Sequence, residues 1–213
     1  MSNNKKAEWV KEKITNTSTN VEIVKDNILS IEREGKGKFL VATMSERIIN
    51  EEVIKTTVSG KSVDFVVNIS KEPYITKGAL DFAERNNFSI GGMGDIASAL
   101  NDGNLNCYLN KEIAFVSRGL LQHSRVKSIS RLDNRRFRIT RIDLEPVTVV
   151  SINEYEITAD VVRETKDNFP PFDAILKSNP NGRITSEARR AAESSGLYIY
   201  KWGELMGALN KKW

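Results

Sequence analysis

Residues 64–100 read DFVVNISKEPYITKGALDFAERNNFSIGGMGDIASAL and carry the strongest fold signal in the chain. The opening segment, residues 64–69, is a mainly apolar run typical of a strand buried on both faces of a parallel sheet. Thr76 can cap a helix whose apolar residues recur at helical spacing until Asn86 and Asn87 end it. Residues 88–90 then predict another strand, and Gly94-Asp95 a further helix. This alternation predicts parallel strands joined by right-handed crossovers.

A second stretch, residues 173–209, repeats the pattern as DAILKSNPNGRITSEARRAAESSGLYIYKWGELMGAL. A shift of 109 positions aligns residues 41–101 with 150–210 without a gap, and about a quarter of the aligned positions are identical, which indicates an internal repeat. The identical pairs include Ile75/Ile184, Thr76/Thr185, Ala79/Ala188, Ala83/Ala192, Gly94/Gly203 and Leu100/Leu209. The predicted fold class is therefore α/β, with two tandem copies of a β-rich start followed by βαβαβα, mostly parallel sheets, and helices on the faces.

The predicted organisation has four segments. They are an N-terminal lead at 1–20, a first α/β repeat at 21–101, a connector at 102–129 and a second α/β repeat at 130–210. Residues 21–24 and 28–31 flank the turn-like triplet Lys25-Asp26-Asn27, so the first repeat is expected to begin with a hairpin. Residues 137–142 are its expected counterpart in the second repeat.

Composition narrows the possible chemistry. Cys107 is the only cysteine and His123 the only histidine, too few to build a zinc site from Cys and His. Metal chemistry would therefore need carboxylates that hold a hard cation such as Mg²⁺. The N-terminal residues lack the apolar stretch of a secretion signal, and no run of apolar residues is long enough to cross a membrane. The expectation is a cytoplasmic protein with no membrane partner.

The segments 64–100 and 173–209 resemble the closing part of restriction-endonuclease-like domains of the Mrr type. The shared features are an apolar strand, a loop ending in Thr, a helix with paired alanines, a short strand and a helix that begins with Gly and an acid. The resemblance covers about a third of the chain and implies a nuclease fold that acts on DNA, often in restriction or antiviral defence. Such nucleases hold Mg²⁺ with an Asp and the Glu of an E-x-K triplet.

A candidate for that triplet occurs in the first copy, where Glu34-Gly35-Lys36 matches the E-x-K pattern and Asp26 precedes it. The matching second-copy positions are Asp143 and Glu145, without the lysine, and the strands that start at Asp64 and Asp173 hold no E-x-K. The prediction is therefore a pair of degenerate nuclease-like repeats without a cofactor. A Mg²⁺-dependent nuclease that uses Asp26, Glu34 and Lys36 remains an alternative.

Positive charge gathers in one part of the chain. Residues 118–141 contain eight Lys or Arg residues and one acid, a local formal charge of +7, whereas the whole chain carries +4. The candidate nucleic-acid-binding residues are Arg118, Arg125, Lys127, Arg131, Arg135, Arg136, Arg138, Arg141 and Arg183. Arg136 and Arg138 alternate with Phe137 and Ile139, so a strand there would project both arginines to one face. That face could contact phosphates, or its arginines could pair with acids of the other copy or of a partner protein.

Two loops add further candidates, because ligands of open parallel sheets gather beyond the carboxyl ends of the strands. These are Lys71 in the first copy and the loop 179–183, Asn-Pro-Asn-Gly-Arg, in the second. The glycine cluster 91–95 lies where backbone amides can bind a phosphate, but a tight turn from strand to helix is the favoured interpretation. The predicted function is a nucleic-acid-binding subunit of a restriction, defence or mobile-element system, with DNA or RNA and other protein subunits as partners. A non-catalytic protein-assembly factor is the third possibility.

Overall fold

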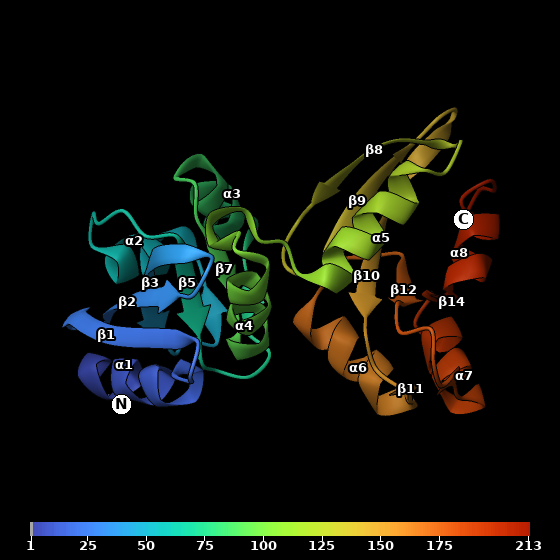
Figure 1. Cartoon of the computed structure of the whole chain (residues 1–213). Coiled ribbons are helices and arrows are strands. Elements are labelled where there is room, and N and C mark those ends of the chain that lie inside the picture. Colours follow the sequence, from blue (N-terminus) through green and yellow to red (C-terminus); the bar gives the residue numbers. More distant parts are fainter. Residues whose placement is uncertain (1) are drawn as a thin grey trace. The chain divides into compact units, whose positions relative to one another are not determined.

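The computed structural model describes residues 2–213, and residue 1 of the predicted lead lies outside the described residues. The chain forms two compact units that divide between Asn110 and Lys111 (Figure 1). Both units are mixed α/β structures, as the alternation of strand and helix signals predicts.

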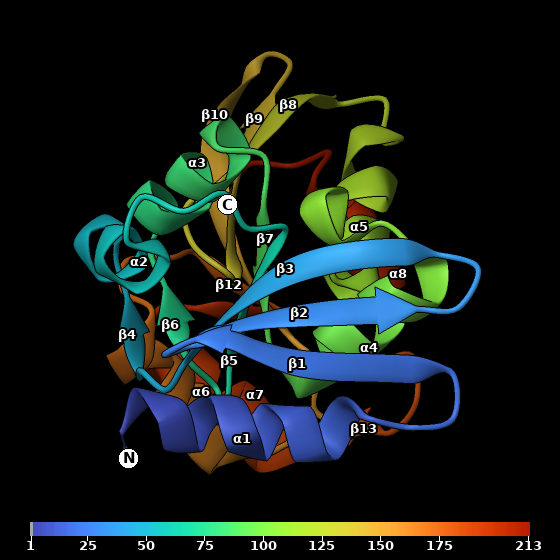
Figure 2. The same cartoon turned by 60° about the vertical axis from the view of Figure 1, so that its left-hand side comes forward.

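The first unit is built on a five-stranded sheet with the strand order β1-β2-β3-β5-β7. Strands β1–β3 pair antiparallel, and β3, β5 and β7 pair parallel. Figure 2 shows β1, β2 and β3 side by side, with α1 running along them. In order, the elements are α1 (Asn3–Ile14), β1 (Thr19–Lys25), β2 (Ile28–Arg33), β3 (Gly37–Met44), β4 (Ile48–Ile49), α2 (Glu51–Val58), β5 (Phe65–Asn68), β6 (Tyr74–Ile75), α3 (Lys77–Arg85), β7 (Ser89–Gly91), α4 (Met93–Asp102) and the 3-10 turn η1 (Leu105–Cys107).

The second unit has the sheet order β14-β12-β10-β9-β8, again with one antiparallel and one parallel half. Its elements are α5 (Lys111–Leu121), β8 (Val126–Arg131), β9 (Arg136–Arg141), β10 (Leu144–Ile152), β11 (Glu156–Ile157), α6 (Ala159–Asn168), β12 (Ala174–Lys177), β13 (Arg183–Ile184), α7 (Ser186–Ser194), β14 (Tyr198–Lys201) and α8 (Trp202–Ala208). The large sheets are thus mixed and not mostly parallel, because tight turns join the first three strands of each and such turns connect antiparallel neighbours.

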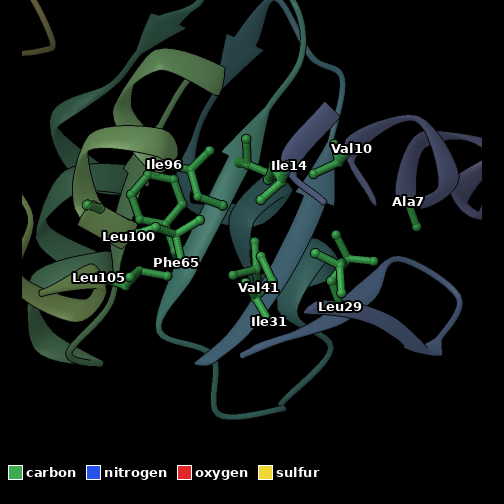
Figure 3. Close-up of a cluster of buried hydrophobic side chains, with 13 residues drawn as sticks. Ala7, Val10, Ile14, Leu29, Ile31, Val41, Phe65, Ile96, Leu100 and Leu105 are labelled. Atoms are coloured by element: carbon green, nitrogen blue, oxygen red, sulfur yellow. The ribbon is translucent and has the colours of Figure 1, made fainter. Parts of the chain in front are cut away.

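Each sheet has an apolar core on both faces. In the first unit, Phe65 packs with residues of α1 and α4 on one face (Figure 3), while Val66, next in sequence, points to the α2 and α3 face. The second unit repeats this division, with α5 and α8 on one face of the sheet and α6 and α7 on the other. Alternate burial of successive residues on two faces explains the continuous apolar runs in β5 and β12.

Helices α1 and α5 arise from segments that the sequence analysis set apart as the lead and the connector. Ala7, Val10 and Ile14 of α1 are buried in the core of the first unit. Ile113, Val116 and Leu120 of α5 are buried in that of the second. Both helices are therefore integral parts of their units.

The two units correspond at an offset of 109 residues from Asp64 onward but at 108 before it, because Val41 pairs with Phe65 whereas Val149, not Val150, pairs with Ala174. The ungapped alignment of 41–101 with 150–210 is therefore wrong for its first part, where the second unit has one extra residue before β12.

Side chains at structurally corresponding positions nevertheless make similar hydrogen bonds. Asp64 accepts the backbone N–H of Leu40 at 2.8 Å, and Asp173 accepts that of Thr148 at 2.6 Å. Thr76 and Thr185 cap α3 and α7 by accepting the N–H groups of the residues three positions later. The two aspartates thus join neighbouring strands, which is a structural use of their charge.

Candidate functional site

The second unit contains a cavity of about 640 Å³ at the carboxyl ends of its parallel strands. Strands β10, β12 and β14 end at Ile152, Lys177 and Lys201, and the residues that follow them form much of the wall. The lining residues are Lys111, Glu112, Phe115, Asn153, Lys177, Ser178, Asn179, Pro180, Gly182, Lys201, Trp202 and Gly203. The cavity lies where ligands of open α/β sheets bind, and it includes part of the 179–183 loop that the sequence analysis singled out.

Lys177, the last residue of β12, is 3% exposed. Its ammonium group donates to the carbonyl oxygen of Asn179 at 2.7 Å and also to that of Asn181. Burial lowers the pKa of Lys177, and the charge of nearby Lys201 lowers it further. The lysine therefore holds the loop that walls the cavity and adds positive potential at its base.

Glu112, in the first turn of α5, is the acid among the lining residues. Its carboxylate accepts the hydroxyls of Ser151 at 2.9 Å and Ser178 at 2.6 Å, and it lies 3.4 Å from a guanidinium nitrogen of Arg135. These bonds fasten α5 to the ends of β10 and β12. Lys111, Lys177 and Lys201 outnumber Glu112, so the lining residues together carry a formal charge of +2, and Lys111 and Lys201 are exposed.

An aromatic pair, Phe115 of α5 and Trp202 at the start of α8, forms one wall of the cavity. The ring centroids lie 5.1 Å apart with an interplanar angle of 45°. Phe115 is 54% exposed, an unusual amount for a large apolar ring. Together with Lys111 and Lys201, this pair provides apolar ring surface beside positive charge.

Gly119 makes room for Trp202. A Cβ atom at this position would lie 2.3 Å from the indole carbon Cζ2. We therefore expect Gly119→Ala to displace the indole and to shift its Nε1–H resonance, with a loss of about 1–3 kcal/mol from overpacking. Two-dimensional NMR and urea unfolding measure both effects. Gly207→Ala is the matched control, because a Cβ there meets nothing within 4 Å; equal effects of both substitutions would contradict this assignment.

Several of the arginines predicted to bind phosphate are engaged inside the protein. Arg136 donates through Nε to buried Asp133 at 2.6 Å and through Nη1 to the Pro170 carbonyl at 2.8 Å. Arg141 is 5% exposed and donates to the backbone carbonyls of Glu145 and Lys211. Arg136 and Arg138 alternate with the buried Phe137 and Ile139 of β9, but Arg136 offers no free guanidinium on that face, because a local acid and loop carbonyls already hold it.

The other predicted cations are distributed over the second unit. Arg118, Arg125, Lys127 and Arg138 are exposed, with Arg125 4.0 Å from Asp143 and Arg138 3.3 Å from the Thr148 hydroxyl. Arg135 contacts Glu112, Arg131 is half-buried in β8, and Arg183 pairs with Glu156. Among these, Arg118 lies three residues after Phe115 on α5, so the two side chains share one face of the helix, although Arg118 does not line the cavity.

Asp26, Glu34 and Lys36 do not come together. Asp26 lies in the turn before β2, whereas Glu34 and Lys36 lie in the turn after it. The intervening strand, Ile28–Arg33, separates the two turns by roughly 20 Å, at about 3.3 Å per residue. Throughout residues 2–213, no three His, Cys, Asp or Glu side chains converge in a way that could hold a metal ion. The nuclease trio of the sequence alternative is therefore not assembled.

The corresponding region of the first unit has the same helix cap but different side chains. The N–H of Gly92 donates to the Asp95 carboxylate at 2.9 Å, as the N–H of Lys201 donates to the Glu204 carboxylate at 2.7 Å in the second unit. Lys71 is exposed in the loop after β5. Positions 109 residues before Lys177, Lys201 and Trp202 hold Asn68, Gly92 and Met93. That replacement of neutral residues by two cations and an indole is the sequence signal that could have pointed to the cavity.

Comparison with family models, curated proteins and solved structures finds no match to this chain. A search of the helices within residues 2–213 finds none with the length and apolar character needed to span a bilayer.

Proposed function

We propose that this chain is a non-catalytic, cytoplasmic nucleic-acid-binding protein whose two units arose by duplication and whose second unit contacts the nucleic acid. The carrying observation is the exposed Phe115 ring, which packs on Trp202 and lines one cavity with Lys111 and Lys201, while exposed Arg118 follows three residues later on α5. Aromatic faces beside a cationic surface are the combination with which proteins bind single-stranded nucleic acids without needing a fixed sequence.

Helical spacing arranges the α5 part of this surface. Lys111, Phe115 and Arg118 lie four and three residues apart and so share one stripe of the helix, while Lys201 extends the surface from the end of β14. The ammonium and guanidinium groups would neutralise phosphates, and the ring between them would meet a base. We call Lys111, Phe115, Arg118, Lys201 and Trp202 the α5–α8 surface.

Three observations support a duplicated origin. The two sheets have the same strand order and the same division into antiparallel and parallel halves. Asp64 and Asp173 make the same bond to a neighbouring strand, and residues 64–101 align with 173–210 without a gap. Divergence of one copy would then account for a cationic, aromatic cavity in the second unit at positions where the first holds Asn68, Gly92 and Met93. A role in restriction, defence or a mobile element rests on the Mrr-type resemblance alone.

Salt titration tests the proposal. We expect the affinity for a fluorescein-labelled single-stranded oligonucleotide to fall linearly on a log–log plot against salt concentration. Replacing Lys111 and Arg118 together by Ala should reduce the magnitude of that slope by about 1.4, because each phosphate contact to a single strand contributes about 0.7. Fluorescence anisotropy at several salt concentrations measures both quantities.

The matched control removes two cations from the opposite face of the same sheet. Arg163 and Lys166 of α6 are exposed and lie away from the α5–α8 surface, so the Arg163→Ala, Lys166→Ala double variant should keep the parent slope. Absent or salt-independent binding would overturn the proposal and favour a protein-assembly role. An equal reduction of the salt slope in both double variants would show that binding depends on the net charge of the protein and not on the α5–α8 surface.

A further inference from the structure

We infer that the cavity of the second unit binds one unstacked nucleotide, with the base against Phe115 and Trp202 and the phosphate between Lys111 and Lys201. The inference deepens the proposed function and rests on it, because it names the unit of nucleic acid that this surface would take up. It concerns an extruded or single-stranded nucleotide and not a paired one.

The size of the cavity fits this ligand. Sites for small molecules typically enclose about 300–1,000 Å³, and the present cavity has about 640 Å³. That volume is large enough for a single nucleotide. A base that packs against a protein ring in such a pocket has left its own stack, which costs least in a single strand.

Charge within the cavity favours a phosphate. Lys111, Lys177 and Lys201 contribute three positive charges, and Glu112, the acid among the lining residues, is held by Ser151, Ser178 and Arg135. Lys177 is occupied with two loop carbonyls, so it acts through its field. Lys111 and Lys201 are exposed, and their ammonium groups can contact a phosphate directly.

The remaining lining groups suit a base. The Phe115 ring is exposed, and the Trp202 ring, which also lines the cavity, lies with its centroid 5.1 Å from it. Asn153, which follows β10 and is exposed at the cavity, carries an amide that can donate and accept at once, as the N6 and N7 edge of adenine requires. Adenosine 5′-monophosphate is therefore the appropriate probe.

The experiment uses the full chain labelled with ¹⁵N and follows the indole Nε1–H resonances of Trp9, Trp202 and Trp213 during titration with adenosine 5′-monophosphate. We expect the Trp202 resonance to shift in a saturable manner, while Trp9, in the first unit, and Trp213, whose indole donates to the Ala208 carbonyl, stay in place. Adenosine should bind more weakly, and inorganic phosphate should leave the Trp202 resonance unmoved.

Variants separate the two halves of the ligand. Phe115→Leu keeps an apolar side chain without the aromatic face and should weaken binding of the nucleotide and of adenosine by about tenfold. Lys201→Gln should lower the affinity for the nucleotide roughly fivefold and leave the affinity for adenosine unchanged. Lys166→Gln on α6 is the matched control and should change neither affinity.

The outcomes are distinguishable from those of the salt titration. Salt-dependent oligonucleotide binding without a Trp202 response to the mononucleotide would overturn the cavity assignment and leave the proposed function standing. A Trp202 response without any oligonucleotide binding would retain the cavity and overturn the proposed function. An equal response to inorganic phosphate would reduce the cavity to an anion site and overturn the inference.

Discussion

Replacing Phe65 by Ala is expected to lower the free energy of unfolding of the first unit by about 3–5 kcal/mol. The side chain is fully buried in β5 and packs against Ile96 and Leu100 of α4 (Figure 3), with the Tyr108 ring 6.4 Å away. Its removal leaves a cavity that the surrounding sheet and helices cannot fill, because β5 is a central strand between β3 and β7. The expected decrease in the free energy of unfolding is the sum of the transfer free energy of the ring and the cost of the cavity that it leaves.

Urea unfolding followed by tryptophan fluorescence measures this loss. Trp9 packs against the same core as Phe65 and reports on the first unit, whereas Trp202 and Trp213 report on the second. Phe115→Ala is the matched control, because that ring is 54% exposed and its loss should cost well under the amount expected for Phe65. Equal destabilisation by the two substitutions would show that burial does not set their effect.

The second large effect is expected at Asp133, which is fully buried beside a positive charge. Its carboxylate accepts the backbone N–H groups of Arg135 and Arg136 at 2.7 Å and the Arg136 side chain at 2.6 Å. Asp133→Asn keeps the size of the side chain and one carbonyl oxygen but removes the charge. The Arg136 guanidinium, 11% exposed, then loses its ionic partner, and we expect a loss of about 3 kcal/mol from the second unit.

The chain provides a matched control for this pair. Asp160 and Arg163 have the same i,i+3 spacing and the same 2.6 Å separation, but their side chains are 92% and 66% exposed. Asp160→Asn should therefore cost at most about 0.5 kcal/mol. Adding Arg136→Met to Asp133→Asn should restore part of the lost stability, because an uncompensated buried charge costs more than an absent pair. Failure of this double variant to recover any stability would assign the loss to the backbone bonds of Asp133.

Much of the fold could be predicted because its signals are local. The caps Thr76 and Thr185, the apolar runs of β5 and β12 and the alternation of strand and helix involve residues close together in sequence. The hairpin over residues 21–31 likewise follows from a turn between two apolar segments. The packing of α1 and α5 against the sheets could not be read in the same way, since it depends on which apolar stripe meets which sheet face.

The exposure of the individual arginines could not be predicted from the sequence. Eight cations within residues 118–141 define a local net charge, but the sequence does not determine which of them are exposed to solvent. Arg141 is buried under Trp213, with its guanidinium 5.3 Å from the ring centroid, although the two residues are far apart in the chain. Burial lowers the pKa of Arg141, while the charges of Asp173 and Glu145 oppose that shift.

The sequence alone determined the succession of strands and helices, the caps and the matching of residues 64–101 with 173–210, because neighbouring residues set backbone propensity and periodicity. The cavity and the assignment of each arginine to solvent or to an internal partner are properties of the folded chain. Phe115, Lys177 and Lys201 meet at one sheet edge only after β12 and β14 pair and α5 packs on their face. Burial and charge pairing depend on contacts between distant segments, and those contacts exist only in the tertiary structure.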